Sequence, residues 1–246
     1  MTFSADGTTH RNINYASRHV NLQAESYSAD SQDMEMGHAT RLIGVHSTLD
    51  GSSEESVKAW KNLLGNITDI YNQSPLGERA GYLLRVVDIF VKLTGMHTDH
   101  CAKEKKDVRL LEQEKIFATY QSLGEDQIAE KSNEELLPYF LEAQKKMFDL
   151  AGGKKKWDML SEEEKTERHA VSMEQLTKDL GKDHYEKLSD DEKQILKLFI
   201  WAGCGCHKDL NTVRGGNTAM MAWWKDNHVE PPVLLANRDN AAILSD

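Results

Sequence analysis

The first 48 residues carry an alternation of polar and apolar positions that is typical of β-strands. In "TTHRNINYASRHVNLQA" the apolar positions include Ile13, Tyr15, Val20 and Leu22. The segment "HATRLIGVHSTL" is a short run rich in β-branched residues, with a glycine and a serine as punctuation. We expect two or three antiparallel strands in this part of the chain.

From residue 53 the pattern changes to the three- and four-residue spacing of an amphipathic helix. Ser53 is a suitable N-cap, and the helix should end near "NQSPLG", where a proline and a glycine interrupt it. The next segment, "GYLLRVVDIFVKLTG", is almost continuously apolar and fits either a buried strand or a buried helix. The apolar stripe of the first helix consists of Val57, Trp60, Leu63, Leu64, Ile67 and Ile70.

Residues 100 to 200 form a charged zone with helical patterning. It opens with "CAKEKKDVRLLEQEKIFATYQSL", and a second helix should begin at the cap Ser132 and end at the glycine pair 152–153. Ser161 and Ser189 each precede a glutamate by three residues, which predicts two further helices with capping boxes. Between the helix that begins at Ser132 and the helix that begins at Ser161, we expect "GGKKKWD" to be an exposed loop. Strands followed by a helical block indicate an α/β core with a helical insertion.

Composition limits the class of protein. With 39% hydrophobic and 28% charged residues the 246-residue chain should be globular. The net charge of -10 excludes a wholly basic nucleic-acid wrapper but permits a local basic face. The sequence lacks both an apolar run of the roughly 20 residues that span a membrane and a secretory signal. Its three cysteines do not form a disulfide framework. We therefore expect an intracellular protein that is neither secreted nor membrane-bound.

Two aspartates stand where a carboxylate pair could form. Asp6 precedes Gly7, so it is either a turn residue or a carboxylate projecting from a strand end. Asp99 lies between an apolar segment and a charged helix, where it or Thr98 could instead cap that helix. If a sheet brings Asp6 and Asp99 together, the pair suits Mg²⁺, which prefers oxygen ligands and supports phosphoryl transfer.

Three blocks of the sequence resemble a known family. "SADGTTHRNINYASRHVN", "GMHTDHCAKEKKD" and "CGCHKDLNTVRGGNTAM" are similar to segments of transposase-like proteins abundant in basidiomycete fungi. They are more distantly similar to the hAT and the Kyakuja, Dileera and Zisupton groups of cut-and-paste DNA transposases. The resemblance covers most of the chain, but the charged middle matches only as a helical insertion.

The resemblance implies a ribonuclease H-like fold, with a mixed sheet, flanking helices and a helical insertion. The first part of the core would span residues 1–124, the insertion 125–188, and the return to the core 189–246. In the family the first catalytic aspartate lies on the first strand and the second follows the fourth, and the matching residues here are Asp6 and Asp99. The implied reaction is hydrolysis and strand transfer at DNA phosphodiesters with Mg²⁺ or Mn²⁺.

The same resemblance implies a nuclear or intracellular protein that binds DNA and could form a homo-oligomer. The third catalytic acid is not assigned: Glu230 and Asp239 are the late candidates, and the family's third acid would more naturally lie beyond Asp246. The chain therefore resembles a fragment or a decayed copy, and we expect it to be inactive alone.

A cysteine and histidine cluster lies near residue 204. The family has a Cys-x-x-His block followed by leucine and asparagine, which Cys204, His207, Leu210 and Asn211 match except that Leu210 lies one residue later than expected. A structural zinc needs about four ligands, which would require Cys101, His97 or His100 to complete the cluster. The alternative is that Cys204 and Cys206 are small buried side chains at a helix start.

Basic and aromatic residues leave further alternatives open. Arg11, Arg18, Lys103 and Lys106 could contact DNA phosphates, but the run 103–109 could equally be a solvated helix face, because Glu104 and Asp107 interleave with it. Trp201, Trp223 and Trp224 are expected in the core or at an interface. Two other functions stay open. One is a catalytically dead DNA- or protein-binding remnant, and the other is a phosphohydrolase whose metal ligands are His97, Asp99 and His100.

Overall fold

The computed structural model describes residues 1–10, 13–25, 36–48 and 52–229. The chain forms two compact units, Met1–Gly203 and Cys204–Asp246, and each is considered by itself. The expected late candidates Glu230 and Asp239 and the expected DNA contact Arg11 lie outside the described residues.

The first unit is built on a mixed sheet. The strand β1 (Thr2–His10) pairs antiparallel with β2 (Ile13–Glu25), and β2 pairs antiparallel with β3 (Met36–Thr48). On the other side of β1, the strand β4 (Gly95–Thr98) runs parallel to it, and β5 (Ile200–Gly203) runs parallel to β4. Within the described residues the strand order is β3-β2-β1-β4-β5. The expected α/β class and the expected antiparallel strands before residue 48 are confirmed.

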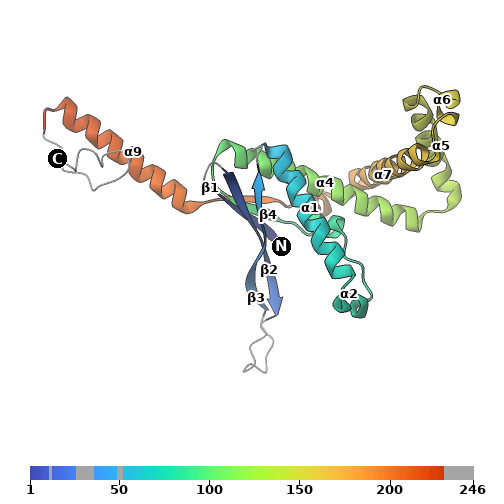
Figure 1. The fold of residues 1–246 in the computed structure, drawn as a ribbon, viewed down its shortest axis with the longest axis horizontal. Coiled ribbons are helices and arrows are strands. Elements are labelled where there is room, and N and C mark those ends of the chain that lie inside the picture. The colour runs from blue at the N-terminus through green and yellow to red at the C-terminus, as the bar shows by residue number, and fades with distance from the viewer. Residues whose placement is uncertain (11–12, 26–35, 49–51, 230–246) are drawn as a thin grey trace. The chain divides into compact units, whose positions relative to one another are not determined.

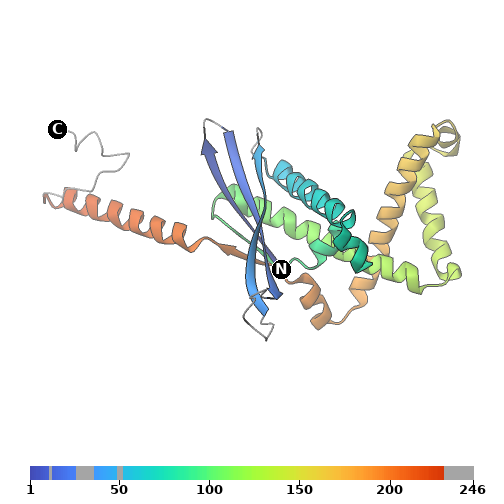
Figure 2. The same ribbon diagram turned by 60° about the horizontal axis from the view of Figure 1, so that its bottom comes forward.

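Two long helices cover one face of this sheet (Figures 1 and 2). They are α1 (Ser53–Asn72) and α4 (Ala102–Glu130). The ring of Phe3 on β1 stacks on Trp60 of α1, with centroids 4.5 Å apart and planes 8° from parallel. Such a pair contributes about 0.5–1.5 kcal/mol beyond the burial of its area. Leu93, Met96 and Leu111 complete the centre of the core and are 0–1% exposed.

The apolar segment that the sequence left undecided contains both kinds of element. It holds the short helix α3 (Val86–Val91) and ends at Gly95, the first residue of β4, and it follows another short helix, α2 (Pro75–Ala80). The predicted helix at 53–71 is confirmed, but its N-cap is Ser52, whose side chain accepts a hydrogen bond from the Glu55 amide. The expected cap, Ser53, is buried and donates to the Lys103 carbonyl oxygen at 3.4 Å.

The charged zone is helical as expected. It contains α5 (Asn133–Leu150), α6 (Lys154–Asp158), α7 (Glu162–Lys187) and α8 (Asp190–Lys197). The capping boxes predicted at Ser161 and Ser189 are present, and Ser132 caps α5 in the same way. The prediction of an exposed loop at "GGKKKWD" is wrong, because this segment includes α6. Trp157 of α6 is buried against the rings of Phe148 and His169.

Helix α4 runs without a break past residue 124, so the expected boundary between 124 and 125 falls inside a helix. The chain returns to the sheet at β5, within the segment expected to do so. The second unit contains α9 (Gly205–Asp226), which begins at the N-cap Cys204. Among the described residues, no helix combines the length and the hydrophobicity needed to cross a bilayer.

Candidate metal site beside β1 and β4

The pairing of β1 with β4 puts Asp6 on one strand and Asp99 directly after the neighbouring strand. In this parallel pair Phe3 is level with Met96, and Ser4 is level with His97. If this register continued for two more residues, Asp6 would be level with Asp99, but β4 ends at Thr98, one residue before Asp99. Asp6 lies on β1 itself, and Asp99 follows the last residue of β4.

Side-chain alternation puts Asp6 on the face of the sheet away from α1 and α4. Phe3 and Met96 are both buried against those helices, so Ser4 and His97, and two residues after Ser4 also Asp6, belong to the opposite face. Asp6 is exposed and Asp99 is half-buried. The Asp6 backbone oxygen accepts a hydrogen bond from the Ser17 hydroxyl at 3.3 Å, which ties this part of β1 to β2.

A further carboxylate, Glu104, lies in the first turn of α4, the helix that follows Asp99. Burial raises the pKa of Glu104, and the charges of Asp107, Asp99 and Asp6 raise it further, while Lys103 opposes them. The sequence interpretation missed Glu104 because it searched for a third acid only near the C-terminus. A signal was available: an acidic residue in the first turn of the helix that follows Asp99.

Beneath the carboxylates lies a buried group of opposite charges. Arg18 is 1% exposed, and its Cζ lies 5.1 Å from the centre of the Trp60 ring. Burial lowers the pKa of Arg18, while Asp107 and Glu104 counteract that shift. Asp107 is 2% exposed, and its Oδ2 accepts a hydrogen bond from Lys103 Nζ at 3.1 Å. The buried guanidinium thus balances part of the negative charge of this region.

Among the residues expected to contact DNA phosphates, one is buried and two are paired with carboxylates. The burial of Arg18 does not fit the expectation that it contacts phosphate, because its guanidinium has no surface to offer. Lys103 bridges Glu104 and Asp107, and Lys106 pairs with Glu54 at 2.7 Å. Both lysines are half-exposed but are already engaged with carboxylates. They fit the interpretation of a solvated helix face with interleaved charges.

The residues around Asp99 take separate positions. His97 lies on β4 and is exposed, whereas the His100 ring packs edge-on against Trp201 at 5.3 Å. Trp201 Nε1 donates to the Thr98 hydroxyl at 3.0 Å, which fixes the end of β4 against β5. The expectation that Thr98 or Asp99 caps the following helix is wrong, because the N-cap of α4 is Cys101.

The cysteine cluster gives no positive sign of a zinc site. The described residues include no group of three or more His, Cys, Asp or Glu that could hold a metal ion. The side chain of His207 lies outside that description. Cys204 is half-buried and Cys206 is exposed, so the expectation that both are buried is wrong, although they do stand at a helix start.

A groove of about 830 Å³ lies between α5 and α7, away from the carboxylates. It has apolar walls with charged residues among them. Its lining includes Ser172 but no histidine that could act as its base, so we do not assign it any chemistry. Its lining includes Tyr139, Ala143, Met147, Leu150, Val171 and Leu176.

Two nearby carboxylates can serve a small hard cation. Mg²⁺ usually keeps several waters and binds through one or two protein carboxylates together with substrate phosphates. Asp6 and Asp99 fit this donor set by residue type, although among the described residues they belong to no group of three or more His, Cys, Asp or Glu that could hold a metal ion. The arrangement can therefore attract a divalent cation, but without one it would repel a phosphate.

Comparison of the chain with protein-family models, with curated proteins and with solved structures finds no match. A functional proposal therefore rests on the residues of this chain and on their geometry.

Proposed function

We propose that the chain is a transposase-like protein with a ribonuclease H-like core, in which Asp6 and Asp99 bind Mg²⁺ and thereby a DNA phosphodiester. The observation that carries the proposal is the pairing of β1 with β4, with Asp6 on β1 and Asp99 directly after β4. One aspartate on the first strand and one directly after the fourth is the placement that the family resemblance implies.

The sheet adds support at the level of the fold. Ribonuclease H-like sheets have three antiparallel strands followed by two that run parallel to the first. The order β3-β2-β1-β4-β5 in this chain agrees with that pattern. The long helical segment between β4 and β5 corresponds to the expected helical insertion.

The chemistry follows from the charge of the site. Mg²⁺ at such a position supplies Lewis-acid stabilisation to the attacking and leaving oxygens of a phosphodiester. Asp6 and Asp99 would hold the ion, and Glu104 would add negative potential that strengthens its binding. The proposed site supplies only two carboxylate ligands, so we expect metal-dependent DNA binding but no robust nicking by this chain alone.

Metal binding is tested first, by thermal unfolding with and without Mg²⁺. At a Mg²⁺ concentration about tenfold above Kd, binding to the folded state adds about 1.4 kcal/mol, or a rise in Tm of roughly 3–6 °C for a chain of this size. Asp6→Asn and Asp99→Asn should each abolish this rise. Asp126→Asn, which removes an exposed carboxylate elsewhere on α4, should keep it. A rise that survives in Asp6→Asn and Asp99→Asn would place the metal elsewhere.

DNA binding then separates this proposal from the non-catalytic remnant. We expect fluorescence anisotropy with labelled DNA to show binding that depends on Mg²⁺ and on both aspartates. Equal binding in EDTA would favour the remnant, which is suggested by the lack of a three-ligand group among the described residues. Robust Mg²⁺-dependent nicking of plasmid DNA would contradict our expectation that the chain is inactive alone.

The phosphohydrolase alternative has less support. It requires His97, Asp99 and His100 to face one ion within a helical surround. Here His97 is a strand residue, and the ring of His100 packs on Trp201.

A further inference from the structure

Helix α9 presents an apolar stripe to solvent. Within the chain, 52–70% of each of Leu210, Val213 and Met220 is exposed, and Trp224 is half-buried. A monomer that leaves such residues exposed along one helix incurs a cost that burial against a partner would recover.

The spacing of this stripe is that of a coiled coil. Starting at Cys206, successive seam residues follow one another at intervals of four, three, four, three and four. With Leu210 at heptad position a, the seam alternates d and a over the whole helix. The seam consists of Cys206 (d), Leu210 (a), Val213 (d), Asn217 (a), Met220 (d) and Trp224 (a).

A polar residue within the seam indicates how the helix pairs with its partner. Asn217 occupies a central a position, where a single asparagine fixes register and oligomeric state at some cost in stability. In a parallel pair in register, the two Asn217 side chains face each other and can hydrogen-bond. In an antiparallel pair with aligned ends, Asn217 would instead oppose the apolar Val213.

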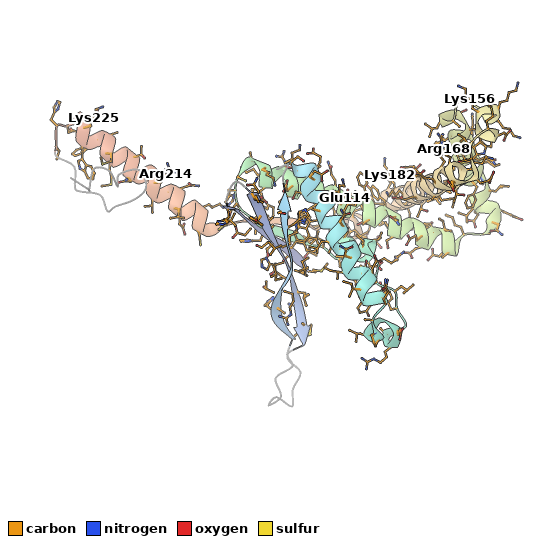
Figure 3. The ribbon with its side chains drawn as sticks, in the orientation of Figure 1. Glu114, Lys156, Arg168, Lys182, Arg214 and Lys225 are labelled. Atoms are coloured by element: carbon orange, nitrogen blue, oxygen red, sulfur yellow. The ribbon has the colours of Figure 1, made fainter. Side chains whose placement is uncertain are left out.

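The charges beside the seam are complementary to a second copy. Asp209 lies at position g and Arg214 at position e, five residues later. In a parallel dimer a g residue pairs with the e residue five positions on in the partner helix. Asp209 of one helix therefore meets Arg214 of the other, and symmetry creates the pair twice. Figure 3 shows Arg214 near the middle of α9.

From these observations we infer that α9 forms a parallel two-stranded coiled coil with α9 of a second copy of this chain. The exposed glycines Gly215 and Gly216 fall at the outer position f and at the flanking position g. They weaken an isolated helix by about 1 kcal/mol each relative to alanine, so pairing supplies stability that α9 by itself lacks. The inference rests on α9 alone and is independent of the proposed metal site.

Light scattering coupled to gel filtration of the full chain tests the dimer. We expect a dimer whose fraction rises with concentration. Val213→Glu with Met220→Glu should make it monomeric, since both charges enter the seam. The matched control, Thr212→Glu with Ala222→Glu, adds the same charge at the outer positions c and f and should remain dimeric. A monomeric wild-type chain, or a dimer that survives the seam substitutions, would overturn the inference.

Charge reversal tests the register. Asp209→Arg or Arg214→Asp alone should weaken the dimer about tenfold, because each change affects two ion pairs. The double variant Asp209→Arg with Arg214→Asp should restore wild-type affinity. Failure of the double variant to recover would rule out the parallel pairing.

Cysteine crosslinking tests the orientation directly, at a protein concentration where the chain is dimeric. In the variant Cys101→Ser with Cys204→Ser, only Cys206 remains, and a short bismaleimide should join two chains across position d. Moving the thiol to the outer face, with Cys206→Ser and Ala222→Cys added to those changes, should abolish the crosslink. Strong crosslinking at residue 222 but not at 206 would contradict the parallel seam.

Discussion

At the scale of single residues, Glu104 is the side chain whose titration reports on the carboxylate site. Its pKa is raised above the ordinary value of 4.5 by burial and by Asp107, Asp99 and Asp6. The folded state therefore holds the proton of Glu104 more tightly than the unfolded state does. The free energy of unfolding consequently falls as pH rises from about 4.5 through the raised pKa.

The change Glu104→Gln removes this penalty. We expect it to raise Tm at pH 7, by roughly 2–4 °C for each kcal/mol relieved in a chain of this size, and to leave Tm unchanged below pH 4. Glu112→Gln, on the same helix but about 12 Å further along its axis, is the control and should show no such pH-dependent gain. A gain for Glu104→Gln that persists at acid pH would have a cause other than the charge of Glu104.

Residue positions could be predicted from sequence only where local alternation decides them. Asp6 and Asp99 were chosen as a pair, and the structure puts Asp6 on β1 and Asp99 directly after β4, the strand beside it. Arg18 was misjudged as a surface residue, although it stands two residues before Val20 and four before Leu22, on the same face of β2. The alternation thus predicts that Arg18 points inward. We expected it at the surface instead, because charged side chains are so rarely buried.

At the scale of elements, the contact between α4 and α7 depends on two glycines. A Cβ on Gly181 would collide with the Tyr120 carbonyl oxygen and would lie 2.7 Å from the Gly124 amide nitrogen. Backbone atoms cannot yield as a flexible side chain can. Gly181→Ala should therefore push the helices apart and lower stability by about 1–3 kcal/mol.

The control for this change is Gly65→Ala on α1, where a Cβ would meet nothing within 4 Å. That substitution should raise stability by about 0.5–1 kcal/mol, because alanine loses less conformational entropy in a helix. Urea unfolding of both variants measures the contrast. Equal effects would mean that helix propensity alone, and not the close approach at Gly181, sets the cost.

The same two helices show which elements could be predicted. Capping boxes at Ser161 and Ser189 are local, so the sequence located these helix starts correctly. The end of α4 could not be predicted from the local sequence. Gly124 lies in the interior of this helix, where Thr177 of α7 packs against it. Likewise, the lysine run before Trp157 was expected to be a loop, and only the contacts of Trp157 with Phe148 and His169 account for α6.

At the scale of the whole molecule, the two compact units should differ in how their stability responds to concentration. The first unit is held by its own core, in which Phe3, Trp60 and Leu111 are 0–1% exposed. In α9, by contrast, Leu210, Val213 and Met220 are at least half exposed within a single chain. If α9 pairs with a second copy, its protection comes from association and obeys mass action.

Hydrogen exchange measured by mass spectrometry on the full chain tests this difference. Amides of β1 and β4 should be protected equally at low and high protein concentration, because they open only when the core of the first unit does. Amides of α9 should exchange rapidly at low concentration and become protected as the dimer forms. Val213→Glu with Met220→Glu should keep α9 in rapid exchange at every concentration while β1 and β4 stay protected. Protection of α9 that is independent of concentration would show that the helix is stabilised within one chain, and the coiled coil would then not be its source.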